Sequence, residues 1–117
     1  MDNNQIADTF SLLAKIMDIN GENSFKTRSY SSAAFQIEKM EMQLAALQPN
    51  EIAAQRGIGN AIAQKIVELL QTGKLSMLEK YLEQTPTGVI EMLNIKGIGP
   101  KKINTIWKEM GIESIGE

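Results

Sequence analysis

RGIGNAIAQKIVELL at residues 56–70 and KGIGPKKINTIWKEM at residues 96–110 are the stretches that decide the fold. Each stretch has a basic residue, then Gly-Ile-Gly, then apolar residues at helical spacing, and the two copies are forty residues apart. Such an internal repeat predicts one supersecondary unit used twice. In each copy we expect a short helix, a glycine turn and a longer amphipathic helix.

The glycine turns have a chemistry of their own. Glycine permits positive φ and close backbone approach, and the helix that follows begins with free N–H groups and the positive end of its dipole. A turn of this kind can hold a phosphate oxygen on backbone donors. The isoleucine between the glycines, Ile58 or Ile98, is expected to pack between the two helices of its hairpin. Lysines beside the second turn predict a salt-sensitive attraction to a charged backbone that does not depend on base sequence.

Gly-x-Gly also occurs in motifs of other kinds. A dinucleotide fingerprint needs a third glycine where Ile62 or Lys102 stands, and it needs a preceding strand where these segments look helical. The plainer alternative is a pair of tight helix corners with lysines on a solvated face. Two copies, each preceded by Arg56 or Lys96, favour phosphate binding over that alternative.

Apolar residues recur at helical spacing along the whole chain, and no segment alternates with the period of a strand. In the second helix Phe25, Tyr30 and Ile37 are among the residues expected to supply apolar surface, and Ser76 is expected to cap a later helix. The sequence therefore predicts an all-α fold. The expected helices cover about residues 4–19, 25–40, 49–54, 60–72, 76–83, 89–93 and 100–110.

Composition excludes several classes of protein. The 117 residues contain no Cys and no His, so disulfides, thiol nucleophiles, His bases and zinc sites built from those ligands are excluded. All three aspartates lie within the first eighteen residues and form no Asp-x-Asp pair, which argues against a complete polymerase or a metal nuclease. Lacking a membrane span or a secretory signal, the chain is expected to be cytoplasmic.

Charge is distributed unevenly. Residues 1–52 hold four Lys and Arg against seven Asp and Glu, whereas residues 53–117 hold eight against seven. A basic face is therefore expected only locally, and mostly in the second half.

Taken together, the two glycine hairpins resemble the helix-hairpin-helix motif, and their arrangement is similar to the N-terminal region of family X DNA polymerases, the polymerase beta type. GIGNAIAQKIVELLQTGKLSMLEKYLE looks like the later part of the lyase domain of that family, and EMLNIKGIGPKKINTIWKEMGIESI looks like the start of its fingers region. The resemblance implies a lyase-like helical domain at residues 1–84 and a second hairpin at residues 85–117. It also implies that the chain is part of a larger polymerase or a shortened relative.

The resemblance implies DNA as partner, bound as a monomer at gaps, nicks or abasic ends, with the two hairpins on different strands. The DNA-binding residues carried over are Lys26, Tyr30, Arg56, Gly57, Gly59, Asn60, Ala61, Lys96, Gly97, Gly99, Lys101 and Lys102. Family hairpins can also hold a monovalent cation, Na⁺ or K⁺, on backbone carbonyls. The corresponding carbonyls are those of Gln55, Ile58, Leu93, Ile95 and Ile98.

Lys65 matches the Schiff-base lysine with which family members remove a 5′-deoxyribose phosphate. Such an amine must be neutral part of the time, which burial or nearby positive charge favours. Ala53, Ala61 and Met77 stand where active members commonly carry lysines. Two alternatives to DNA binding therefore stay open: a lyase acting through Lys65, and a helical module that binds other proteins.

Overall fold

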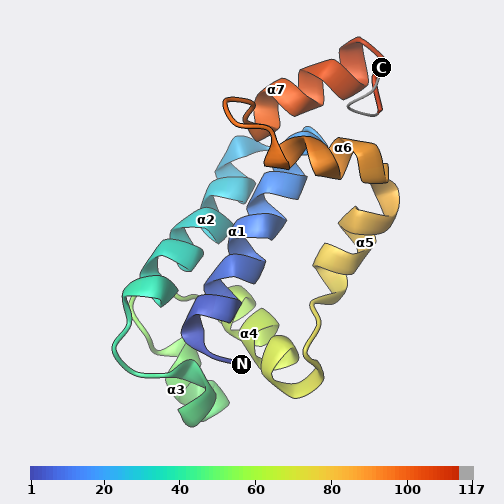
Figure 1. Cartoon of the computed structure of the whole chain (residues 1–117). Coiled ribbons are helices and arrows are strands. Elements are labelled where there is room, and N and C mark those ends of the chain that lie inside the picture. The colour runs from blue at the N-terminus through green and yellow to red at the C-terminus, as the bar shows by residue number, and fades with distance from the viewer. Residues whose placement is uncertain (114–117) are drawn as a thin grey trace.

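The computed structural model describes residues 1–113, and the last four residues of the second predicted hairpin region lie outside them. The described residues contain helices and no strand, which confirms the all-α fold (Figure 1). The α-helices are α1 (Asn3–Ile19), α2 (Ser24–Lys39), α3 (Pro49–Ala53), α4 (Asn60–Thr72), α5 (Ser76–Gln84), α6 (Thr87–Glu91) and α7 (Pro100–Asn104).

Helices α1 and α2 form an antiparallel pair that carries most of the core. At the start of α1, the Asp2 carboxylate accepts a hydrogen bond from the Gln5 N–H at 2.8 Å, and the Gln5 side chain accepts one from the Asp2 N–H at 2.9 Å. This reciprocal cap satisfies two of the free donors of the first turn. The two helices are joined at Gly21, whose φ of 79° favours glycine.

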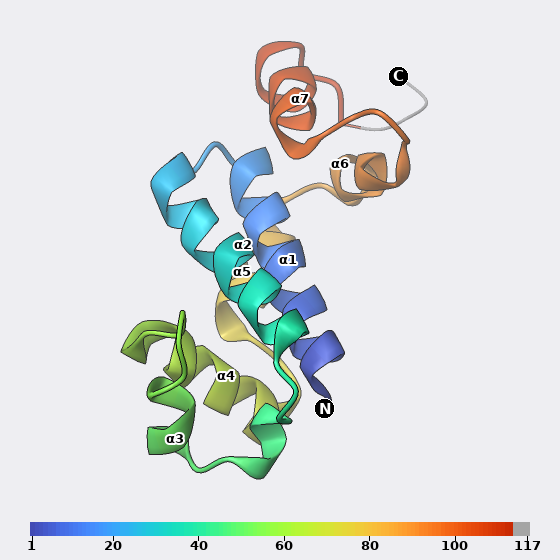
Figure 2. The same ribbon diagram turned by 90° about the vertical axis from the view of Figure 1, so that its left-hand side faces the viewer.

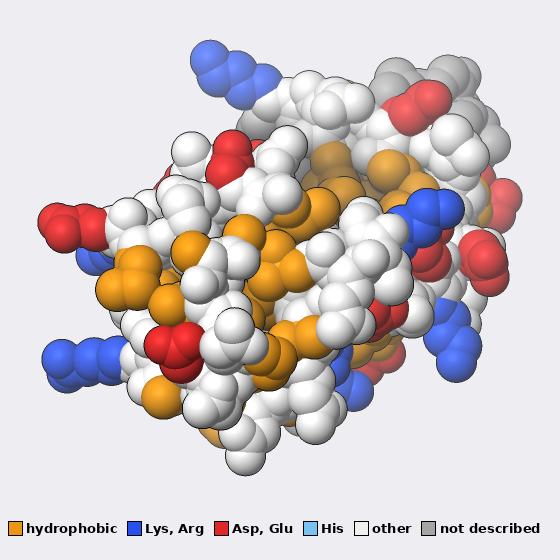
Figure 3. All heavy atoms as spheres, turned by 90° about the horizontal axis from the view of Figure 1, so that it is seen from below, with side chains coloured by type: hydrophobic (Ala, Val, Ile, Leu, Met, Phe, Trp, Pro, Cys, Tyr) orange, Lys and Arg blue, Asp and Glu red, His pale blue; other side chains and the backbone are white. Residues whose placement is uncertain are grey.

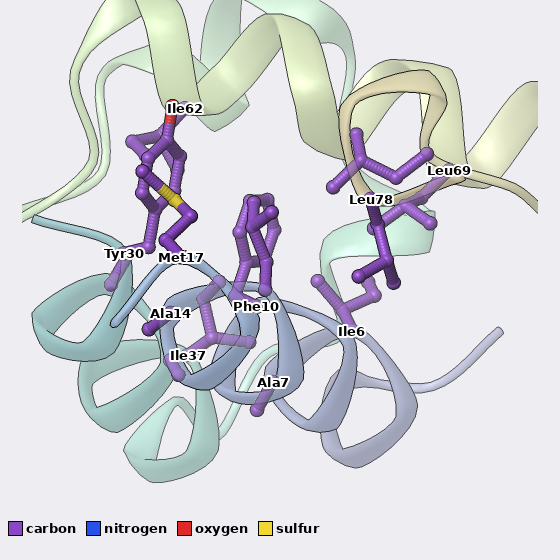
Figure 4. Close-up of a cluster of buried hydrophobic side chains, with 14 of the residues drawn as sticks. Ile6, Ala7, Phe10, Ala14, Met17, Tyr30, Ile37, Ile62, Leu69 and Leu78 are labelled. Carbon is purple, nitrogen blue, oxygen red and sulfur yellow. The ribbon is translucent and has the colours of Figure 1, made fainter. Parts of the chain in front are cut away.

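The core lies between this pair and helices α4 and α5. Figure 4 shows Ile62 and Leu69 of α4 and Leu78 of α5 facing side chains of α1 and α2. The rings of Phe10 and Tyr30 stack at 6.2 Å between centroids. Because α4 supplies buried residues at positions i, i+4 and i+7, its predicted amphipathic face is the one that packs.

Helix α4 ends as predicted, whereas α5 begins differently. Gly73 adopts the left-handed conformation, with φ of 76°, directly after α4. The prediction that Ser76 caps α5 is wrong, because Leu75 takes the cap position and Ser76 is the first helical residue. The Ser76 backbone N–H donates to the Glu68 carboxylate at 2.9 Å, and its hydroxyl donates to the same oxygen. Ser76 therefore ties the two helices together.

The end of α5 packs against the corner between α1 and α2. The Asn20 amide donates to the Thr85 hydroxyl at 3.0 Å, and that hydroxyl donates to the Tyr81 carbonyl at 2.7 Å. Burial, together with a hydrogen bond to Glu22, raises the pKa of Tyr81 to about 12. This polar contact fixes where the chain leaves α5 toward the second hairpin.

The second hairpin rests on the same corner. Helix α6 is followed by a 3-10 turn at Met92–Asn94, whereas the sequence predicted one helix over 89–93. The helix predicted over 100–110 is α-helical only to Asn104 and continues as a π-helical turn, Thr105–Glu109. Within that turn lies Trp107, the chain's only tryptophan, half-buried with the Lys108 amine 3.8 Å from its ring centroid.

The molecule is elongated, with extents of 47 × 25 × 22 Å. Figures 1 and 2 place α7 at one end of the α1–α2 pair and α3 with α4 at the other. A short 3-10 turn, Leu44–Ala46, connects α2 to α3. Within residues 1–113 no helix has the length and apolar character needed to cross a membrane.

Candidate functional site

The two glycine turns have the same backbone conformation. The first glycine of each, Gly57 and Gly97, has a positive φ of 83° and 90°. The second glycine is extended in both copies, with φ and ψ of -90° and 176° at Gly59 and of -87° and 169° at Gly99. The sequence repeat is therefore a structural repeat.

Hydrogen bonding in the two turns is also the same. The Ile58 N–H donates to the Gln55 carbonyl at 3.1 Å, and the Ile98 N–H donates to the Ile95 carbonyl at 3.3 Å. Ile58 is buried as predicted, whereas Ile98 is only half-buried. The first turn is thus the more tightly packed of the two.

The helix after the first turn presents free donors to the surface. The first bond of the α4 ladder runs from the Ala63 N–H to the Gly59 carbonyl at 2.9 Å. The N–H groups of residues 60–62 precede that bond, and in the described chain no side chain caps this end. At the second turn Pro100 has no N–H, so α7 offers one donor fewer.

The two glycines of a turn differ in what the fold requires of them. A Cβ on Gly57 would lie 2.9 Å from Gln36 Cγ, in addition to the strain of a positive φ. No described atom lies within 4 Å of a Cβ placed on Gly59 or Gly99. Since any residue adopts their φ values, the fold does not require glycine at either position. The space beside each of these two helix starts is therefore open.

A depression of about 600 Å³ lies between the first turn and the N-terminal half of α2. Its lining brings together five of the residues predicted to bind DNA, which are Lys26, Tyr30, Gly57, Gly59 and Ala61. The other lining residues are Phe25, Arg28, Ser29, Ser32 and Ile62. Hydroxyl, aromatic and basic side chains therefore surround the uncovered helix end.

Sequence reasoning missed Phe25, Arg28, Ser29 and Ser32 as lining residues. Phe25 was expected to supply apolar surface to the second helix, and this is wrong, because its side chain is 78% exposed. The missed signal was spacing, since residues 25, 29 and 32 lie on one face of a helix. Because Lys26 and Tyr30 lie on the same helix, the sequence could have predicted that this face adjoins them.

Arg56 and Asn60 do not line this depression, although both are exposed. Asn60 lies at another hollow of about 360 Å³ between α3 and α4, together with Pro49, Ala53 and Val67. Figure 3 shows the lower face of the molecule, where hydrophobic side chains are exposed and charged ones stand mostly toward its edge. The predicted residues of the first hairpin are thus divided between two surfaces.

Tyr30, which lines the depression, lies close to Lys65 of α4. Tyr30 is only 8% exposed, and its hydroxyl donates to the Met77 sulfur at 3.5 Å. The half-buried Lys65 has its amine 5.7 Å from the centroid of the Tyr30 ring. Met77, at a position where the family resemblance would favour lysine, therefore contributes packing.

In the second hairpin, one lysine reaches back to α2. The Lys101 amine donates to the Ser24 hydroxyl at 3.2 Å, and the Asn104 amide donates to the Ile19 carbonyl at 2.6 Å. Lys96 and Lys102 are exposed, so both are available to solvent. The lysines predicted to bind DNA lie at the surface, and Lys101 lies beside the residue that precedes Phe25.

The cation site stays a prediction. Two of its five carbonyls, those of Gln55 and Ile95, accept the turn hydrogen bonds described above, and a carbonyl oxygen retains a second lone pair. Neutral backbone oxygens of this kind suit a monovalent ion better than a transition metal. Among residues 1–113 no group of three or more His, Cys, Asp or Glu could hold a metal ion.

Comparison with known proteins agrees with this geometry. A family model described as a helix-hairpin-helix domain matches residues 1–75. The DNA polymerase/3′-5′ exonuclease PolX of Bacillus subtilis (strain 168) is 31% identical over 100 residues, which are 86% of this chain and 17% of that protein. DNA polymerase lambda of Rattus norvegicus is 26% identical over 114 residues, or 97% of this chain and 19% of that protein.

The chain thus spans less than a fifth of the length of either relative. Both relatives are family X polymerases, which confirms the resemblance carried by the two Gly-Ile-Gly hairpins. With the family model covering well over half of the chain and its first hairpin present in the structure, the chain belongs to the helix-hairpin-helix domain family.

Proposed function

We propose that the chain binds the DNA backbone without sequence preference through its two hairpins, as a module of a family X DNA polymerase. The observation that carries the proposal is the open second glycine of each turn. At Gly59 and Gly99 neither φ nor packing requires glycine, and both stand at the N-cap of a helix beside open space. A phosphate approaching the backbone donors needs that open space.

Charge supports the same proposal. Three segments free of acidic residues, at 23–37, 52–67 and 92–108, contain eight of the twelve Lys and Arg and none of the fourteen Asp and Glu. They are most of α2, the turn of the first hairpin with the adjoining helix ends, and most of the second hairpin. An otherwise acidic chain therefore offers its cations to a polyanion on the elements that carry the glycine turns.

Titration of labelled duplexes at several salt concentrations tests the proposal. Log affinity is expected to fall linearly with log salt, equally for unrelated sequences, because counterions are released from phosphates. Changing Lys101 and Lys102 together to Glu is expected to weaken binding and flatten the salt slope by about one to two units. Gly59→Ala is expected to weaken binding while leaving the thermal unfolding midpoint nearly unchanged.

The matched control changes Lys74 and Lys80 together to Glu. This pair alters the net charge equally, but Lys74 lies in the connection between α4 and α5 and Lys80 lies within α5, away from both Gly-Ile-Gly turns. Comparable losses in both double variants would show that only net charge matters, and a flat titration at low salt would favour a protein-binding module instead. A gapped duplex with a 5′-phosphate, compared with an intact one, tests the preference for strand ends.

A second candidate function is a lyase acting through Lys65. It is favoured by the half-buried Lys65, whose amine lies 5.7 Å from the ring centroid of Tyr30, a residue that lines the depression beside the first turn. The amine would form a Schiff base with the sugar aldehyde and release water, after which β-elimination would expel the phosphate. Borohydride trapping on DNA with a 5′-deoxyribose phosphate is expected to give an adduct that Lys65→Arg lacks and Lys80→Arg keeps. No adduct with the unaltered protein would leave binding alone.

A further inference from the structure

One side of α1 lies at the surface of the molecule. It carries four residues at intervals of three, one and three, which places them on one side of a helix, namely Asp8, Ser11, Leu12 and Lys15. Asp8 and Lys15 are exposed, whereas Ser11 and Leu12 are half-buried. The buried apolar residues of α1 lie on the opposite side of the helix. We call these four residues the outer face of α1.

A hollow lies along each side of this outer face. The smaller one, of about 220 Å³, is bounded by Phe35 and Glu38 of α2. The larger one, of about 420 Å³, is bounded by residues of α6 and the turn that follows it, which are Ile90, Glu91, Leu93 and Asn94. Asp8 and Ser11 line both hollows. Neither hollow shares a lining residue with the depression beside the first glycine turn.

Apolar side chains lie in both hollows. The Phe35 ring is 54% exposed in the smaller hollow. In the larger hollow Leu12, Ile90 and Leu93 are half-buried. When one helix packs on another, its side chains enter the grooves on either side of a row of residues. The outer face of α1, with a hollow on each side, therefore has the shape that a further helix would fit.

Charge indicates what kind of helix would fit. Asp8, Glu38 and Glu91 are exposed around the two hollows. Within residues 1–113 none of these carboxylates has a hydrogen-bond or ion-pair partner. Lys15 is the only base among the lining residues of the hollows, and the Lys39 amine lies beside them, 3.9 Å from the Phe35 ring centroid. The excess of acid makes this surface complementary to a cationic partner and unfavourable for a polyanion.

We propose that the outer face of α1 is a docking surface for a helix of another protein, one that carries apolar side chains on one face and Lys or Arg beside them. Its apolar side chains occupy the two hollows, and its basic side chains lie against Asp8, Glu38 and Glu91. This goes beyond the proposed DNA binding and does not depend on it. Because the larger hollow is bounded by Leu93 and Asn94, which precede the second glycine turn, the partner contacts α1 and the second hairpin together.

A synthetic helical peptide of Leu and Lys, with every Leu on one face, serves as the probe. Its binding is measured by fluorescence anisotropy at low salt, and the contacted residues are identified from amide shifts of the isotope-labelled protein. Amides of the outer face of α1 and of residues 90–94 are expected to shift. A peptide with the same pattern but Glu in place of Lys is expected not to bind, and so is a Leu and Lys peptide whose order is scrambled.

Charge variants test where the peptide binds. Changing Asp8 and Glu91 together to Lys is expected to weaken peptide binding by about tenfold or more, because two attractive contacts become repulsive. The matched control changes Glu79 and Glu83 of α5 together to Lys, which alters net charge equally on another surface. All four side chains are exposed, so the unfolding midpoint can verify that each variant is folded.

Two phenylalanines of α2 supply a second matched pair. Phe35→Ala is expected to weaken peptide binding about fivefold through lost apolar contact. Phe25→Ala removes an equally large and more exposed ring that lies in the depression, and it is expected to leave peptide binding unchanged.

Several results would overturn the docking surface. These are no binding of the Leu and Lys peptide, equal binding of the Leu and Glu peptide, and equal losses in the two double variants. If the same amides shift with protein concentration alone, a second copy of the chain is the occupant and the proposed partner is wrong. None of these measurements contains DNA, so their failure leaves the proposed function to its own tests.

Discussion

Gly57 and Gly97 hold equivalent backbone conformations in different surroundings, and this makes them a matched pair at the scale of single residues. Both have positive φ, but only at Gly57 would a Cβ meet a neighbour, Gln36 Cγ at 2.9 Å. Gly97→Ala is expected to lower the free energy of unfolding by about 1–2 kcal/mol through backbone strain alone. Gly57→Ala is expected to cost more, because Gln36 must also move.

Urea unfolding of the two variants measures this difference. Gly57→Ala in a Gln36→Ala background supplies the control, since shortening the neighbour should bring its cost close to that of Gly97→Ala. Equal costs for the two glycines in the unaltered background would contradict the packing shown at the first turn.

At the scale of elements, the connection from α4 to α5 is expected to respond to pH through Glu68. The Ser76 hydroxyl and backbone N–H, more than the nearby Lys65 charge, hold the pKa of Glu68 below its ordinary value of 4.5. A carboxylate with a lowered pKa stabilises the fold above the unfolded value and loses that contribution as pH falls through the folded value. We therefore expect the Glu68–Ser76 contact to weaken below about pH 4.5.

The measurement compares urea midpoints at pH 6 and pH 3. The unaltered protein is expected to lose more stability over this range than Glu68→Gln, which has no carboxylate to titrate at this position. Ser76→Ala should also reduce the loss, because it removes the first-named cause of the lowered pKa. Equal acid sensitivity in all three proteins would show that this contact does not contribute.

An element could be predicted from the sequence only where its own residues form a distinctive pattern. Helix α4 was predicted with both ends, because a glycine stands on each side and its apolar residues have a clear period. The π-helical turn at Thr105–Glu109 was not predicted, since its apolar spacing is the same as that of an α-helix. The role of Ser76 was also missed, because its partner Glu68 lies on another helix.

At the scale of the whole molecule, the second hairpin is expected to depend on the corner between α1 and α2 for its position. Asn104→Ala removes the 2.6 Å hydrogen bond to the Ile19 carbonyl and is expected to lower stability by about 1–2 kcal/mol. Trp107 fluorescence should then change at a lower urea concentration than far-UV circular dichroism, because the second hairpin leaves the α1–α2 corner first. Thr105→Ala, which loses only a bond within its own helix, is the control.

Coincident transitions and an unchanged midpoint in Asn104→Ala would contradict this dependence.

In the candidate site, too, contacts between distant parts of the chain could not be predicted from the sequence. The glycine turns were identified from a local pattern and Lys26 from the family resemblance, whereas the approach of Lys101 to Ser24 depends on how α7 packs on α1. The spacing of apolar residues within one helix does not predict how two distant helices pack.

The open second glycines also have an evolutionary consequence. Positive φ constrains Gly57 and Gly97 through folding, whereas on the proposed function Gly59 and Gly99 are constrained by the ligand that approaches them. A descendant that had lost its ligand could substitute Gly59 and Gly99 by neutral drift and remain folded. Across a lineage, these two positions would therefore record selection for binding, separately from selection for stability.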